Sequence, residues 1–128
     1  MSNDEYMKAL YAIIERAFSA SEKARCEGLL ALEEDMDEDK EPGRDIFEYG
    51  MRFVVDGTDS SVIDKILSNI VRQEKDEQQL LLKTIQKEAL LAVQEGMSTQ
   101  LLAVLLNSYT DLPFNDPVFK NLLDVYCR

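Results

Sequence analysis

The sequence predicts an all-α fold, a soluble bundle of about five helices with one long central helix. Apolar residues recur at spacings of three and four through most of the 128 residues, which is the period of helices that bury one face. No stretch shows the strict alternation of apolar and polar residues that marks a half-buried strand. Hydrophobic residues make up 45% of the chain and charged residues 30%, a composition typical of a folded globular protein.

The first apolar pattern predicts a helix from about Asp4 to Glu34. This segment contains Gly28, and a glycine costs about 1 kcal/mol in a helix interior. The sequence leaves open whether the helix continues through Gly28 or breaks there into two. The next stretch, residues 35–43, is short of apolar side chains and ends in a Pro-Gly pair, so we expect a surface connection.

Four further helices are predicted downstream. A short one covers about residues 46–54. Residues 60–95 contain neither Pro nor Gly, which predicts one long helix that extends beyond a compact bundle and exposes its polar middle, residues 72–79. A fourth helix should follow Ser98, and the last should start at Asp116-Pro117, a capping residue followed by a first-turn proline. At 128 residues the chain is long enough for one core, so we expect a single domain over residues 1–128.

The charge balance excludes two classes of partner. Lys and Arg total 14 against 25 Asp and Glu, a net charge of −11, which has the wrong sign for nucleic acid or for anionic lipid. The longest purely apolar run is Leu101 to Leu106, far short of the roughly 20 residues of a membrane-spanning helix. We expect no nucleic acid partner and no membrane insertion. The N-terminus lacks a secretion signal, so a cytoplasmic location is expected.

Residues that commonly carry chemistry are scarce. The chain has no histidine, the usual general base and the commonest metal ligand, and its five glycines are too scattered to cradle a phosphate. The only cysteines, Cys26 and Cys127, lack zinc spacing and do not form a disulfide framework. We expect Cys26 to be buried on a helix face. The chain should not be an enzyme and should need no cofactor, since catalysis would require a deep pocket with convergent polar groups.

An acidic run over residues 33–48 raises the possibility of a calcium site. Asp35, Asp37 and Asp39 stand at the first, third and fifth positions of an EF-hand-like loop. The sixth position requires glycine and is Lys40, while the twelfth requires glutamate and is Ile46. We therefore expect no metal site, and we interpret the run as a solvated loop or a surface for a basic partner.

Two segments of the chain resemble a known family. Residues 24–33 read ARCEGLLALE and follow Ser21-Glu22-Lys23, and residues 47–59 read FEYGMRFVVDGTD. In their order and spacing they resemble the cytoplasmic loop of the A subunit of flagellar motor stators, the MotA/PomA family. In that family the loop faces the rotor, and its charged residues engage opposite charges of the rotor switch protein. The resemblance therefore implies a protein partner, which would be the rotor switch protein or another motor component.

The resemblance also implies which residues bind that partner. The family's loop arginine corresponds to Arg25, three residues before the motif glycine, and its glutamate corresponds to Glu33. On a continuous helix these two positions are about two turns apart and share a face. Lys23, Glu34 and Arg44 are weaker candidates. The alternative interpretation is that all these residues are inert, solvated surface charges.

The resemblance covers roughly residues 15–75 and not the family's four membrane helices, so we expect a chain that cannot conduct ions. Residues 1–75 would be a stator-loop-like part and residues 76–128 a helical C-terminal half. The function that we infer from the sequence is non-catalytic protein–protein interaction in the flagellar motor. The alternative is a generic helical adaptor or homo-oligomer unrelated to motility, in which the long helix over residues 60–95 provides a dimerisation surface.

Overall fold

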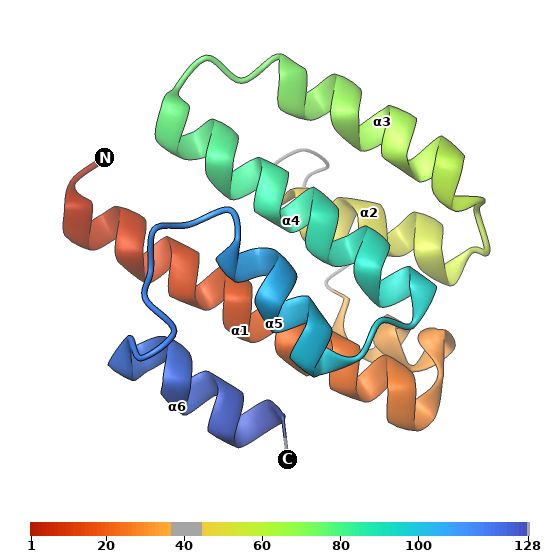
Figure 1. Ribbon diagram of the computed structural model, residues 1–128. Helices are drawn as coiled ribbons and strands as arrows, with labels where there is room; N and C mark the ends of the chain where they lie inside the picture. The colour runs from red at the N-terminus through yellow and green to blue at the C-terminus, as the bar shows by residue number, and fades with distance from the viewer. Residues whose placement is uncertain (37–44, 128) are drawn as a thin grey trace.

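The computed structural model describes residues 1–36 and 45–127 and forms a helical bundle (Figure 1). These residues contain no strand, which confirms the predicted all-α class. The number of helices exceeds the five that were expected, because two of the predicted helices are each divided into two. In chain order the elements are α1 (Asn3–Glu27), the 3-10 helix η1 (Leu29–Asp35), α2 (Ile46–Val55), α3 (Ser60–Arg72), α4 (Glu77–Glu95), α5 (Thr99–Asn107) and α6 (Pro117–Tyr126).

Helix α4 lies at the centre of the bundle and packs against α1, α2, α3 and α5 (Figure 1). Side chains from all the helices meet around it in one core. Phe18 of α1 and Leu67 of α3 are fully buried, as their helical spacing predicts, whereas Phe53 and Leu105 are only partly buried. Residues before and after position 75 therefore contribute to the same hydrophobic core.

Helix α2 approaches α4 closely at Gly50. A Cβ atom at this position would overlap the side chain of Leu90 and would lie 3.0 Å from Cδ1 of Leu67. Protein interiors are packed as densely as organic crystals, so even one methyl group at this contact would displace its neighbours. The absence of a side chain at Gly50 thus sets how closely α2 packs on the centre of the bundle.

The prediction of one long helix over residues 60–95 is wrong. Helix α3 ends at Arg72, the chain reverses, and α4 runs back antiparallel to α3 (Figure 1). Residues 60–95 contain no Pro or Gly, so the break depends on side chains that bind backbone groups. The Glu74 carboxylate accepts hydrogen bonds from the amides of Lys75 and Asp76 at 3.0 and 3.2 Å, and Asp76 caps α4 by accepting one from Gln79 N–H at 2.9 Å. Because these hydrogen bonds satisfy backbone amides of the turn, the chain can reverse here and the apolar faces of both helices can pack in one core.

The first predicted helix breaks at Gly28, which resolves the question that the sequence left open. Gly28 has φ 92°, a left-handed conformation that favours glycine, and its N–H donates to Ala24 O at 2.8 Å to close α1. The chain then turns into η1, whose Leu32 is fully buried. A continuous helix carrying Arg25 and Glu33 on one face is therefore not formed.

Other predictions have mixed outcomes. Cys26 is exposed, contrary to the expected buried cysteine, because its position on α1 lies beyond the packed face; its thiol is 3.7 Å from the Glu22 carboxylate. Cys26 and Cys127 are both free thiols.

Within residues 1–36 and 45–127, no helix is long and apolar enough to span a membrane. Residues 37–44, half of the acidic run, lie outside the described residues, and they include Arg44 and the candidate calcium positions Asp37 and Asp39.

Candidate protein-interaction surface

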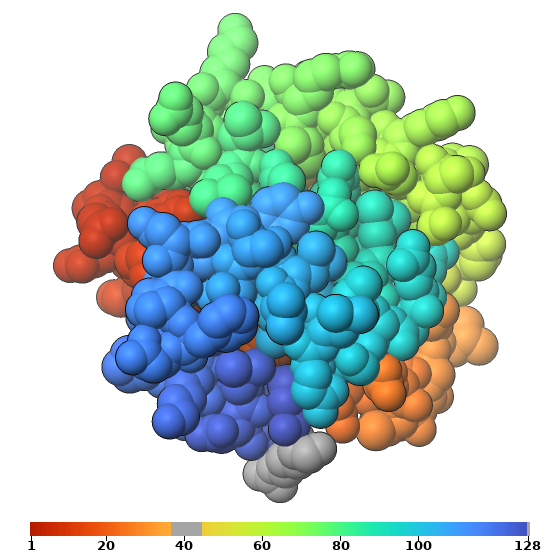
Figure 2. All heavy atoms as spheres, in the orientation of Figure 1, coloured from red at the N-terminus to blue at the C-terminus, as the bar shows by residue number. Residues whose placement is uncertain are grey.

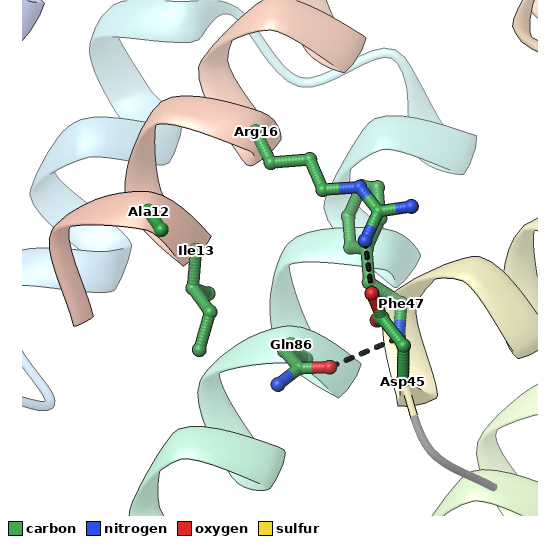
Figure 3. A pocket seen from close by; sticks show the side chains of 6 residues that line it. All are labelled: Ala12, Ile13, Arg16, Asp45, Phe47 and Gln86. Atoms are coloured by element: carbon green, nitrogen blue, oxygen red, sulfur yellow. Dashed lines mark hydrogen bonds and ion pairs between the residues drawn. The ribbon is translucent and has the colours of Figure 1, made fainter. Parts of the chain in front are cut away.

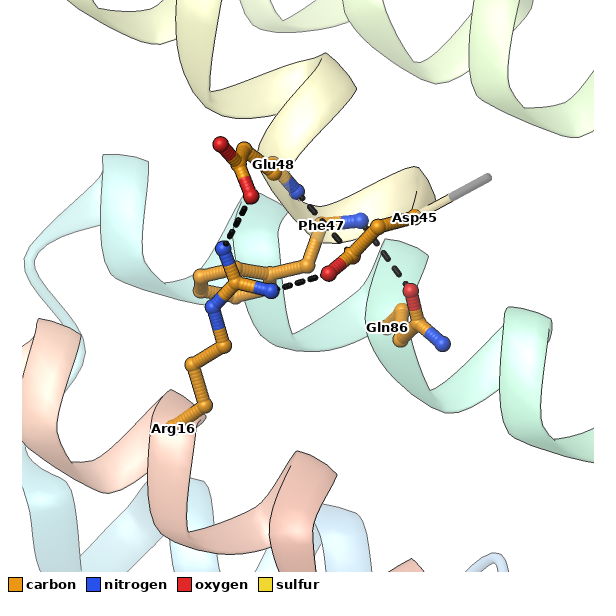
Figure 4. A network of polar contacts seen from close by, with 5 residues as sticks. All are labelled: Arg16, Asp45, Phe47, Glu48 and Gln86. Atoms are coloured by element: carbon orange, nitrogen blue, oxygen red, sulfur yellow. Dashed lines mark hydrogen bonds and ion pairs between the residues drawn. The ribbon is translucent and has the colours of Figure 1, made fainter. Parts of the chain in front are cut away.

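A polar network joins the middle of α1 to the start of α2 (Figure 4). The Arg16 guanidinium forms an ion pair with Asp45 and donates to Glu48 Oε2 at 3.1 Å. It also lies over the Phe47 ring, 5.2 Å from the ring centroid, which is a cation–π geometry. Glu48 is buried, with 7% of its surface exposed, so Arg16 compensates a charge inside the protein.

The same network extends to α4. The backbone N–H of Phe47 donates to Gln86 Oε1 at 3.1 Å, and Asp45 caps α2 by accepting from Glu48 N–H at 3.3 Å. Three helices are thus fixed to one another by side chains and capping groups. The sequence alone gives no indication of this network, because Arg16 is 29 and 32 residues away from its two acidic partners.

A half-open pocket of about 140 Å³ lies beside this network (Figure 3). Among the described residues that line it, the one cation is Arg16, which is already paired with two carboxylates and so offers little attraction to an anionic ligand. These described side chains include no hydroxyl, thiol or imidazole that could act as a nucleophile. The residues that line it are Ala12, Ile13, Arg16, Asp45, Phe47 and Gln86.

A second feature is the corner surface, which we define as residues 23–35, where α1 ends and η1 folds back. Lys23 of α1 forms ion pairs with Glu34 Oε2 at 3.1 Å and with Asp35 Oδ1 at 3.2 Å. These hydrogen bonds raise the pKa of Lys23 above its ordinary value. Together with the buried Leu32, the ion pairs hold η1 against α1. Lys23 and Glu34 are the two predicted partner-binding residues that the structure brings together.

The other two predicted residues lie apart, Arg25 on α1 and Glu33 on η1. Arg25 is exposed, and its Nη1 donates to Gly96 O at 3.2 Å, at the turn between α4 and α5. Glu33 is also exposed, and its carboxylate makes no hydrogen bond or ion pair to the part of the chain that the structure describes. Both side chains can therefore be reached from solvent, although they do not form one continuous stripe.

The exposed part of the corner surface combines charge with one apolar side chain. Leu30 has 71% of its surface exposed, the highest value among the large hydrophobic residues of the described chain. Elsewhere on the corner surface, Glu27, Glu33 and Glu34 are exposed acids and Arg25 is an exposed cation. A largely acidic surface that also exposes a leucine is suited to a protein partner with basic residues and an apolar contact.

Comparison with known proteins finds two similar ones. Motility protein A of Borreliella burgdorferi is 44% identical over 59 residues, which are 46% of this chain and 22% of the relative. Motility protein A of Treponema pallidum is 32% identical over 85 residues, which are 66% of this chain and 32% of the relative. The chain is MotA-like. It spans less than a third of the length of either relative. No protein-family model and no solved structure matches it.

The MotA-like relationship predicted from residues 24–33 and 47–59 is thus confirmed, while the restriction to the cytoplasmic loop stays a prediction. The two MotA-like segments have different structural roles. Residues 47–59 contribute Phe47 and Glu48 to the Arg16 network and Gly50 to the contact with α4, so packing accounts for them. Residues 24–33 lie mostly on the surface, and only Leu32 among them is buried.

No metal-binding geometry appears in the described regions. Within residues 1–36 and 45–127, no group of three or more His, Cys, Asp or Glu side chains is placed to hold a metal ion.

Proposed function

We propose that this chain binds a protein component of the bacterial flagellar motor through the corner surface. The similarity to Motility protein A in two spirochaetes carries the assignment to motility. The exposure of the MotA-like segment at residues 24–33 supports the choice of this surface, because six of its ten residues are exposed and only Leu32, Ala24 and Leu29 pack in or against the core. Arg25, Glu33 and Leu30 would touch the partner.

The proposed role divides the four candidate residues into two pairs. Arg25 and Glu33 are available to a partner, and their opposite charges would select opposite charges facing them. Lys23 and Glu34 bind each other, so they act by holding η1 in place beneath the contact. The partner would be the rotor switch protein or another motor component that presents basic residues to this largely acidic surface.

A contact surface of this kind needs neither catalysis nor ion conduction, and we propose that the chain performs neither. The lack of histidine supports a non-catalytic role, as does a pocket whose arginine is already neutralised. The cytoplasmic location expected from the sequence belongs to the same proposal, since the motor's rotor lies on that side of the membrane in the family that the sequence resembles.

Affinity capture from motile cells tests the proposal. The wild-type protein is compared with the Arg25→Glu, Glu33→Arg variant, which reverses both contact charges and leaves the net charge unchanged. A Lys65→Glu, Asp124→Arg variant makes the same pair of reversals at exposed positions on α3 and α6. Bound proteins are identified by mass spectrometry. We expect motor proteins to be captured by the wild type and the control and to be lost from the corner variant.

Two results would count against this function. Equal capture by all three proteins would remove the corner surface from the interaction. Capture of no motor protein by the wild type, from cells in which the motor is assembled, would favour the generic adaptor instead. Circular dichroism of each variant shows whether a loss of capture reflects unfolding.

A further inference from the structure

Helix α5 differs from every other helix of the described chain in its lack of charge. No charged residue occurs between Glu95 and Asp111, whereas α1, η1, α2, α3, α4 and α6 each carry at least one. In a chain with a net charge of −11 this neutral stretch is conspicuous. In the space-filling view α5 occupies the front of the molecule, where no other helix covers it (Figure 2).

The outer side of α5 is also apolar. Leu101 and Val104 have 54% and 50% of their surfaces exposed, while Leu102 and Leu106 on the opposite side are fully buried. We define the α5 face as Leu101, Val104, Leu105 and Ser108, which follow one another at spacings of three, one and three residues. These positions share one stripe of the helix, the arrangement that packs against another helix.

We propose that the α5 face binds a second copy of this chain, with the two α5 helices antiparallel about a two-fold axis. A two-fold contact sets the same patch against itself, so a charged patch would oppose its own sign. The α5 face carries no charge and so avoids this repulsion between like charges. Two strongly acidic molecules can therefore meet there without placing carboxylates together. Antiparallel packing also places the positive end of each helix dipole beside the negative end of the other, which is a favourable arrangement.

Charge also argues against other occupants and other faces. A basic partner would be drawn to the acidic surfaces of the molecule and would gain nothing from the neutral α5. Val62 on α3 and Val118 on α6 are exposed too, at 45% and 43%, but charged residues stand near them in sequence, Asp64 and Lys65 on α3 and Lys120 on α6. The predicted dimer surface along residues 60–95 is lost with the division of that helix.

Sedimentation velocity over a range of protein concentrations tests the dimer, with a matched pair of variants. Val104→Glu places a charge in the α5 face, and Val62→Glu makes the same change at a similarly exposed valine on α3. We expect the wild type and V62E to dimerise with a Kd on the order of 100 μM, as suits a small interface. V104E should weaken dimerisation at least about tenfold, because two glutamates would face each other.

The salt dependence separates this contact from a charge-driven one. Added salt screens the repulsion between acidic copies, so dimerisation should strengthen as the salt concentration rises. A wild type that stays monomeric up to about 1 mM would overturn the proposal. So would equal weakening by V62E and V104E, or association that salt weakens. Flotation of a monomeric wild type, but not of V104E, with phosphatidylcholine vesicles would assign the α5 face to lipid instead. The test does not depend on the motor partner.

Discussion

Arg16 and Arg25 lie on the same helix, yet the structure gives them different environments. Arg16 is half-buried, pairs with two carboxylates and stacks on Phe47, and so joins α1 to α2. Arg25 is exposed, and within the described residues its side chain donates one hydrogen bond, to Gly96 O. The MotA-like sequence pattern singles out Arg25 and gives no indication of Arg16. The difference separates a residue that maintains the fold from one that is free to contact a partner.

The same contrast extends to the regions around the two arginines. The junction between α1 and α2 is held by a buried network that continues into α4. The corner surface is held by the buried side chain of Leu32 and by the surface ion pairs of Lys23. Changes at the junction should therefore alter stability, whereas most changes at the corner surface should alter binding.

The largest expected effect concerns the anchor of the corner surface. Leu32→Ala should lower the free energy of unfolding by about 3 kcal/mol, because it removes a fully buried side chain and leaves a cavity. Leu30→Ala, two residues away and 71% exposed, should change stability by less than about 0.5 kcal/mol. Urea unfolding measures both. Similar losses for the two variants would contradict the placement of η1.

The next prediction compares the two arginines directly. Arg16→Met should lower the free energy of unfolding by about 2 kcal/mol, because Glu48 is buried and loses its arginine partner. Arg25→Met should leave stability unchanged within error, since the side chain is exposed. Thermal and urea unfolding of both variants provide the measurement. A larger loss for R25M than for R16M would reverse the roles assigned to these residues.

The smallest predicted effect lies at a third contact of α1, where it meets α6. The Tyr11 hydroxyl donates to Asp116, with distances of 3.0 and 2.9 Å to the two carboxylate oxygens. Burial, this hydrogen bond and the Asp116 charge raise the pKa of Tyr11 from 10.0 to about 12. The folded state holds the proton more tightly, so the stabilisation is fully present below pH 10.0 and is lost as the pH rises toward 12.

Partial exposure of Tyr11 limits this effect to about 1 kcal/mol, because water screens the interaction. Unfolding of the wild type and Tyr11→Phe is compared on both sides of this pH interval. The wild type should lose stability relative to Y11F as the pH rises. A constant difference between the two proteins would show that the hydrogen bond to Asp116 is absent in solution.

Local signals in the sequence account for the correct parts of the fold prediction. The spacing of apolar residues identified the helical class, and Asp116-Pro117 marked the start of α6, where Asp116 accepts from Phe119 N–H at 3.1 Å. Gly28 marked a possible break, and its left-handed conformation is the reason for the break. Each of these signals depends on a few neighbouring residues.

The missed features have two origins. Glu74 and Asp76 divide the predicted long helix by binding amides one to three residues away, a local capping signal that the prediction passed over because the segment lacks Pro and Gly. The others depend on distant residues. The ion pair between Glu74 and Lys83, at 2.8 Å, forms only once α3 and α4 are antiparallel. The Arg16 network likewise exists only in the folded bundle. For the candidate site, family resemblance supplied Arg25 and Glu33, and only the structure shows that they lie on separate elements.

The most direct test of the central claim is photo-crosslinking in motile cells. A photoreactive amino acid replaces Leu30 at the corner surface or, as the control, Val62 on α3, and the crosslinked proteins are identified by mass spectrometry. Both side chains are exposed, so neither replacement should disturb the core. We predict crosslinks from position 30 to a flagellar motor protein and none from position 62. Crosslinks to motor proteins from position 62 alone, or from neither position, would contradict a corner surface that binds the motor.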